Sequence, residues 1–140
     1  MCIAIIALGL LNYLAYTVTY ALLGGDAHNG QRVVVQNPDG TREVVYEVRG
    51  HFIHSTTGRE REVGRAAWIY SYLHSLTVPL TSGALIISML VLARPHIVAT
   101  MRGSWISGRL FVGAFGAIVV VAALAVTALF TWDFVLELSR

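Results

Sequence analysis

The histidines are the residues of this chain whose type and spacing could hold a metal ion or a cofactor. His28, His51 and His54 share one polar segment with Asp26, and imidazole and carboxylate groups are both zinc ligands. The residues around His51 and His54 favour an extended chain, in which side chains three positions apart point to opposite faces. These two alone are therefore not expected to bind one ion, although His28 could meet either of them around zinc. Structural zinc sites usually contain cysteine, and this segment has none.

His74 is the histidine that lies within a long uncharged stretch, residues 66 to 93. An ionisable side chain at membrane depth is a functional candidate, so His74 could contact a cofactor, a quinone or a proton path. The alternative is a structural hydrogen bond between helices, and Asn12 lies at a similar depth as a possible partner. Haem of the b type commonly takes two axial histidines from membrane helices. Only His74 is so placed, and haem is not expected.

The familiar catalytic motifs are absent from the sequence. There is no glycine-rich phosphate loop, no His-Glu-x-x-His and no nucleophile elbow. A net charge of +2 gives no electrostatic footprint for nucleic acid, and the single Cys2 excludes an intrachain disulfide. We therefore expect no catalytic activity of its own, no nucleic-acid partner and no cofactor.

Three uncharged runs supply the elements that must position these side chains. A membrane-spanning helix needs about 20 apolar residues, and the composition, 56% hydrophobic and 13% charged over 140 residues, is typical of a small membrane protein. The predicted fold is a single all-α membrane domain with three transmembrane helices, at about 2–23, 65–93 and 110–132. A cleavable signal peptide is the alternative for the first run, but no basic residue precedes it.

Polar and small side chains gather on one face of each helix. Helical spacing of three and four aligns Asn12, Tyr13 and Tyr16 in the first helix, and Ser71, His74 and Ser75 in the second. Such faces are costly against lipid, so they should turn toward other helices, a ligand or a partner subunit. Gly113 and Ala117 form a small-xxx-small pattern in the third helix, which predicts close helix packing there.

The segment 24–64 is polar and should lie outside the membrane. Residues 31–36 and 41–48 are rich in β-branched residues and flank Asn37-Pro38-Asp39-Gly40, a sequence typical of a tight turn. A β-hairpin is therefore predicted between the first two helices. Residues 51–54 could add a third strand, and residues 56–62 are interpreted as a solvated turn.

The remaining segments are a short basic loop, 94–109, and a polar tail, 133–140. Arg94-Pro95 is expected to end the second helix. Trp68 and Trp132 are expected near one membrane surface and Trp105 near the other. Basic residues alone number three on the side of this loop and seven on the other, which would place the hairpin in the cytoplasm. The three are dense in a short loop without an acid, however, and we favour a cytoplasmic loop and amino terminus with the hairpin outside.

The sequence thus favours an interaction protein: a small accessory or structural subunit of a larger bacterial membrane complex, such as one of energy conversion. Its partners would be other membrane subunits and the lipid of a bacterial inner membrane. The alternative is a redox or metal-binding membrane protein that uses His74 or the group His28, His51 and His54.

Overall fold

A computed structural model of the chain describes residues 1–50 and 61–139. Three helices and one small sheet follow in the order α1 (Cys2–Leu23), β1 (Asp26–Gln36), β2 (Arg42–Arg49), β3 (Arg61–Val63), α2 (Arg65–Thr100) and α3 (Gly108–Ser139). The chain is therefore mostly helical, with the sheet inserted between the first two helices, as the sequence predicts.

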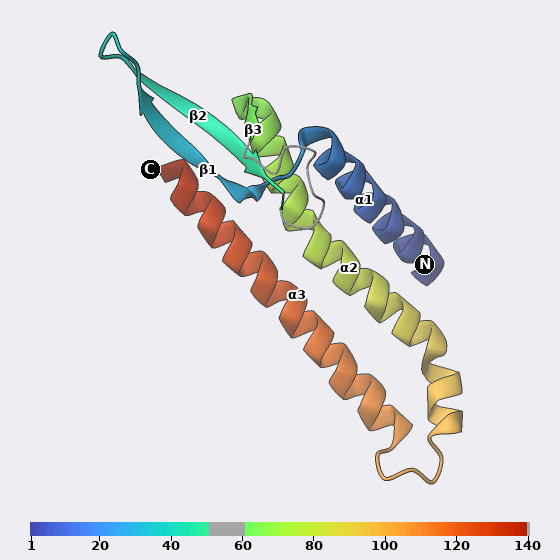
Figure 1. The fold of residues 1–140 in the computed structure, drawn as a ribbon. Helices are drawn as coiled ribbons and strands as arrows, with labels where there is room; N and C mark the ends of the chain where they lie inside the picture. The colour runs from blue at the N-terminus through green and yellow to red at the C-terminus, as the bar shows by residue number, and fades with distance from the viewer. Residues whose placement is uncertain (51–60, 140) are drawn as a thin grey trace.

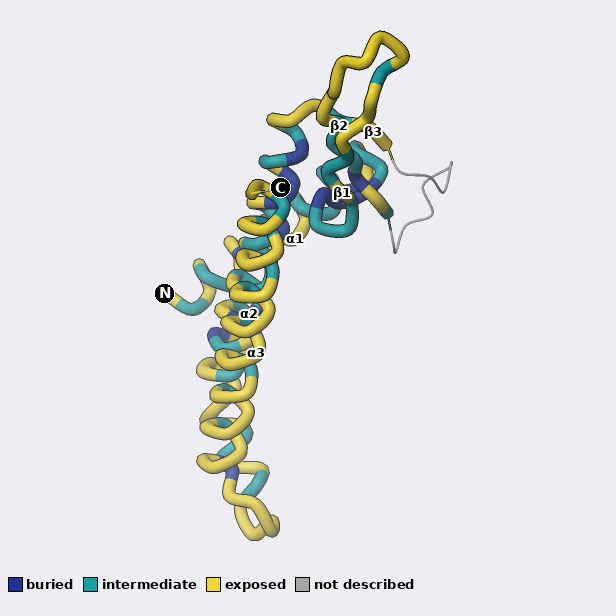
Figure 2. The backbone as a smooth tube through the Cα atoms, turned by 90° about the vertical axis from the view of Figure 1, so that its left-hand side faces the viewer, coloured by how far each residue is buried: buried dark blue, intermediate teal, exposed yellow. Residues whose placement is uncertain are grey.

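The three helices form a row in which α2 is the central member. Figure 1 shows α1 along one side of α2 and α3 along the other. All three are long and apolar enough to cross a membrane, so their length and composition indicate a membrane protein. Within the most apolar stretch of α3 no residue is buried by the rest of the described chain, and Figure 2 shows exposed residues along most of that helix.

The sheet has the strand order β1-β2-β3 and is antiparallel throughout. Its first two strands form the predicted hairpin, with Gln36 paired to Arg42 and Val34 to Val44. Gly40 has φ +84° in the connecting turn, a conformation that glycine adopts without strain. Thr41 donates to Asp39 from its backbone N–H and its hydroxyl, and these bonds hold the pKa of the Asp39 carboxyl below its ordinary value.

β3 corrects the interpretation of residues 56–62 as a turn, at least for its described end. Arg61 and Glu62 pair with Val48 and Glu47, because the alternation of Arg, Glu and Val continues a half-buried strand against β2. The expected third strand at 51–54 lies outside the described residues.

The ends of α2 and α3 correct two predicted boundaries. Helix α2 continues past Arg94 and Pro95 to Thr100. Pro95 removes only one backbone bond, the one to the carbonyl four residues earlier, and the last turns of α2 change direction in Figure 1. Helix α3 continues to Ser139 and includes most of the predicted polar tail. The loop between α2 and α3 is correspondingly shorter than 94–109.

The apolar core lies where the sheet meets the ends of the helices. At about 1.5 Å per residue, the 36 residues of α2 and 32 of α3 are about 54 and 48 Å long, more than the roughly 30 Å of a hydrocarbon layer. Their projecting ends and the sheet enclose Ala27, Val48, Trp68 and Tyr72. Figure 2 shows buried residues gathered at this junction. The sheet and the helix ends beside it therefore have a core of their own.

Trp68 does not act as the expected anchor at the membrane surface. It is fully buried, stacks with Phe134 and has the tilted rings of Tyr46 and Tyr72 beside it. Trp132 and Trp105, in contrast, are 68% and 98% exposed. Both side chains are therefore free to contact the membrane surface.

Candidate functional site

The first of three polar clusters is built around Asp26, the first residue of β1. We call it the carboxyl cluster: Asp26, Tyr16, Ser71 and Ser75. Gly24 ends α1 with φ +79°, and a side chain on Gly25 would collide with the backbone of Arg49. These two glycines turn the chain sharply from α1 into β1, and the Asp26 side chain is thereby directed between α1 and α2.

The Asp26 carboxyl group is 3% exposed and accepts hydrogen bonds from each neighbouring element. The Tyr16 hydroxyl donates to Oδ2 at 2.6 Å, and Ser75 Oγ lies 2.7 and 2.8 Å from the two carboxyl oxygens. Ser71 Oγ and the backbone N–H of His28 donate to Oδ1 at 3.4 and 3.0 Å. Both oxygens are thus satisfied, as a buried carboxyl group requires. The cluster joins β1 to α1 and α2.

The second cluster, the histidine–acid cluster, contains His28, Tyr72, Phe130 and Asp133. The Tyr72 hydroxyl donates to Asp133 Oδ2 at 2.9 Å, so its oxygen can accept from His28 Nδ1 at 3.2 Å. His28 Nδ1 also lies 3.6 Å from Asp133 Oδ2. The His28 ring stacks on Phe130 with centroids 3.7 Å apart. This cluster joins β1 to α2 and α3.

The third cluster, the amide cluster, lies deeper between α1 and α2 and contains Asn12, His74, Thr77 and Thr81. Asn12 Nδ2 donates to the hydroxyls of Thr77 at 3.0 Å and Thr81 at 2.9 Å. Its Oδ1 atom lies 3.2 Å from His74 Nε2. Both threonine hydroxyls donate to backbone carbonyls of their own helix. The structure thus brings Asn12 and His74 together.

The direction of these bonds assigns the protonation of the His74 ring. An amide oxygen only accepts, so with the Asn12 amide in this orientation the contact is a hydrogen bond when His74 Nε2 carries the proton; the Thr77 hydroxyl also lies 3.4 Å from Oδ1. In the neutral ring Nδ1 then carries a lone pair. Nδ1 is buried and has no hydrogen-bond partner within the described part of the chain. The edges of Tyr16 and Tyr70 flank the ring at centroid distances of 5.8 and 5.6 Å.

Other predicted site residues lie elsewhere. Tyr13 is 57% exposed and belongs neither to the amide cluster of Asn12 nor to the carboxyl cluster of Tyr16. His51 and His54 lie outside the described residues. Among the residues that are described, no group of three or more histidine, cysteine or acidic side chains could hold a metal ion. Among the described residues, His28 has the Tyr72 hydroxyl, the Asp133 carboxyl group and the Phe130 ring as neighbours.

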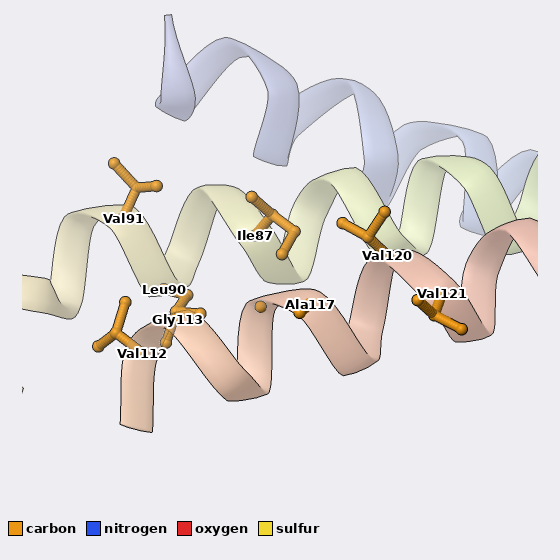
Figure 3. Close-up of a pocket in the computed structure, with 9 residues that line it drawn as sticks. Ile87, Leu90, Val91, Val112, Gly113, Ala117, Val120 and Val121 are labelled. Atoms are coloured by element: carbon orange, nitrogen blue, oxygen red, sulfur yellow. The ribbon is translucent and has the colours of Figure 1, made fainter. Parts of the chain in front are cut away.

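Gly113 and Ala117 line an open apolar groove between α2 and α3, shown in Figure 3. The groove has a volume of about 430 Å³. A side chain on Gly113 would meet no atom within 4 Å, whereas one on Gly83 would lie 2.9 Å from the Cβ of Ala123. Gly83 is therefore a point of close contact between α2 and α3, whereas Gly113 faces outward from the chain.

Asp26, Tyr72 and Asp133 are central to these clusters, and sequence reasoning did not assign them this role. One signal was available in the sequence. Tyr16, Ser71 and Ser75 carry hydroxyl groups near the helix ends that adjoin the hairpin segment, and Asp26 is the first acidic residue after α1. Asp133 was interpreted as part of a polar tail because its partner, Tyr72, is 61 residues away.

Comparisons with known proteins add no relationship. A scan of protein-family models, a search of curated proteins and a search of solved structures each found no match to this chain.

Proposed function

We propose that this protein is an accessory subunit that binds other membrane proteins through α3 and the hairpin. The observation that carries the proposal is the outward-facing Gly113 in an apolar groove. Small residues are typical of helix–helix interfaces in membranes, because they allow the backbones to approach and make many van der Waals contacts. Gly113 makes no such contact within the described chain, so a helix of another subunit is the proposed occupant.

The row of helices supports the same proposal. A layer one helix thick presents two broad faces, and α1 and α3 each have α2 as their main helical neighbour. Outside the membrane, the hairpin projects beyond the helices (Figure 1) and carries exposed valines. Val34, Val35 and Val44 are 54%, 42% and 36% exposed. Val34 and Val44 are paired across the strands and share one face, while Val35 lies on the other. Exposed apolar side chains on a sheet are candidates for contact with a partner protein.

The Gly113→Leu variant tests this function. A leucine side chain would fill the groove and hold a neighbouring helix away, so we expect at least a several-fold loss of cross-linked or co-purifying partner subunits. The full chain is purified in mild detergent, its co-purifying proteins are identified, and the assembly is measured by native mass spectrometry. Ala114→Leu is the matched control, because Ala114 is exposed one position along α3 and does not line the groove. An unchanged assembly in Gly113→Leu would contradict the proposal.

The second candidate is a redox or metal-binding membrane protein, and the buried, unpartnered Nδ1 of His74 favours it. A free imidazole nitrogen is a ligand for metals and haem iron. Elemental analysis and an absorption spectrum of the purified chain separate the two candidates. A stoichiometric metal or a haem absorption band that is lost in His74→Ala would replace the accessory function.

The proposed location is a bacterial inner membrane, with the amino terminus and the α2–α3 loop in the cytoplasm and the hairpin outside. It is supported by the arginines of that loop, which have no acid among them.

A further inference from the structure

The connection between α2 and α3 concentrates positive charge at the end of the molecule opposite the sheet. Arg94, Arg102 and Arg109 all line one hollow of about 300 Å³, together with Pro95, Val98 and Ala99. A second hollow of about 240 Å³ shares Arg102 and Arg109 and adds the loop residues Ser104 and Ser107. No acid occurs between Arg94 and Arg109, so these guanidinium groups have no carboxylate in their own segment.

The fold holds these three cations close together. A side chain on Gly108 would lie 2.7 Å from the Cα of Val98, so glycine at this position allows the start of α3 to touch the end of α2. Ser107 caps α3, accepting from the N–H of Leu110 at 3.3 Å. Ser104 donates to carbonyls of Met101 and Ile106. The loop is thus fixed by its own hydrogen bonds, and like charges remain near one another.

The position of the loop selects the ligand. It directly follows an apolar span, and its Trp105 and Ile106 are 98% and 41% exposed, side chains suited to the headgroup and acyl boundary of a bilayer. Guanidinium groups bind phosphate oxygens through paired, charge-assisted hydrogen bonds. The amino terminus of α3 adds backbone N–H groups and a partial positive charge.

We propose that Arg94, Arg102 and Arg109 form a binding site for the phosphate group of an anionic phospholipid at this membrane surface. The headgroup would lie in the hollow between the three guanidinium groups, and the acyl chains would continue along α2 and α3. The hollow shares no lining residue with the groove at Gly113, which begins about one turn along the helices at Val91 and Val112.

Native mass spectrometry of the full chain tests this site. The protein is released from detergent micelles in the presence of phosphatidylglycerol or, in a separate sample, phosphatidylcholine. We expect selective retention of phosphatidylglycerol by the natural chain. Since each basic residue near an anionic surface contributes about 1 kcal/mol, each single Arg→Gln change should weaken retention about fivefold. R94Q/R102Q/R109Q should abolish the preference, and higher salt should weaken retention in the natural chain.

Matched variants make the result decisive. R42Q removes an exposed arginine at the other end of the molecule and should leave retention unchanged, while R102K keeps the charge and should retain most of the binding. Circular dichroism checks that each variant is folded, and the single variants replace the triple one if it is not. Equal retention of both lipids, unchanged retention in the folded arginine variants, or complete displacement of the lipid by millimolar inorganic phosphate would overturn the proposal.

Discussion

At the scale of single residues, the Asp26 carboxyl group holds together elements that are distant in the sequence. Its partners come from α1 and α2, and Ser75 alone contacts both of its oxygens. Removing one donor from a buried acceptor leaves part of its desolvation cost uncompensated, typically about 1–3 kcal/mol. The stability of the sheet on the helices should therefore depend on these hydroxyl groups.

Ser75→Ala is expected to destabilise the protein by about 1–3 kcal/mol, because it takes the shortest serine contact from Asp26. Hydrogen exchange of the backbone should rise first in the start of β1, which Asp26 fixes. Unfolding in a denaturing detergent and exchange mass spectrometry measure the two effects. Thr100→Ala is the control, because that hydroxyl is exposed and bonds only to its own helix. Unchanged exchange in β1 would show that the cluster does not hold the sheet.

Helical spacing in the sequence identified several members of these clusters but not their centre. Tyr16, Ser71 and Ser75 follow the period of a helix, which is visible in sequence. The direction of Asp26 depends on the turn at Gly24 and Gly25 and on tertiary contacts with Arg49. The same helical spacing grouped Tyr13 with Asn12. In the structure Asn12 faces α2, whereas Tyr13, the next residue along the helix, is exposed.

At the scale of elements, α2 and α3 are in close contact midway along their length, where Gly83 faces Ala123. Gly83 is buried, and a side chain at this point forces the two backbones apart. Overpacking of this kind typically costs about 1–3 kcal/mol. The contact between these helices should therefore require a small residue at position 83.

Gly83→Leu is expected to separate α2 from α3 and lower stability by about 1–3 kcal/mol. Ala84→Leu, a change at the adjacent exposed position, should have little effect. Pairing Gly83→Ala with Ala123→Gly exchanges the two side chains and should recover most of the stability lost by Gly83→Ala alone. Detergent unfolding followed by circular dichroism measures all four variants. A Gly83→Leu variant as stable as Ala84→Leu would contradict the observed packing.

The sequence predicted the type and order of the helices well because uncharged runs of this length are unambiguous. It predicted their ends less well. Arg94-Pro95 and Asp133 resemble stop signals, but a helix can continue through one proline and past the membrane surface. The hairpin could be predicted because its turn is determined by residues that are neighbours in the sequence. The strand β3, in contrast, forms only by pairing with β2.

At the scale of the whole molecule, charge is divided between the two ends. The three arginines of residues 94–109 give +3, and the seven arginines and eight acids elsewhere give −1, which together make the net +2. A count of basic residues alone, three against seven, would place the hairpin in the cytoplasm, but the seven are interspersed with acids, and the short acid-free loop favours its own end in the cytoplasm. The hairpin turn should then be outside the cell membrane.

Labelling of engineered cysteines checks this arrangement in a Cys2→Ser background. A membrane-impermeant maleimide should label Asp39→Cys in cells with a permeable outer layer, and Ser104→Cys only after the inner membrane is opened. Both positions are exposed in the structure. The reverse pattern would show the opposite orientation. Labelling of both positions from one side would contradict three membrane crossings.

The largest fully buried side chains, Trp68, Tyr72 and Val48, all lie at the junction of sheet and helix ends. In the part that would cross the lipid, the helices are held together instead by contacts at small residues and by the hydrogen bonds of the amide cluster. Extraction from the bilayer should thus leave the junction of sheet and helix ends intact, while the membrane-spanning parts of the three helices lose the lateral pressure that keeps them aligned. In solubilised preparations the sheet end should therefore be the most rigid part, and α1, whose far end is not joined to α2 by a loop as α3 is, should separate from α2 most readily.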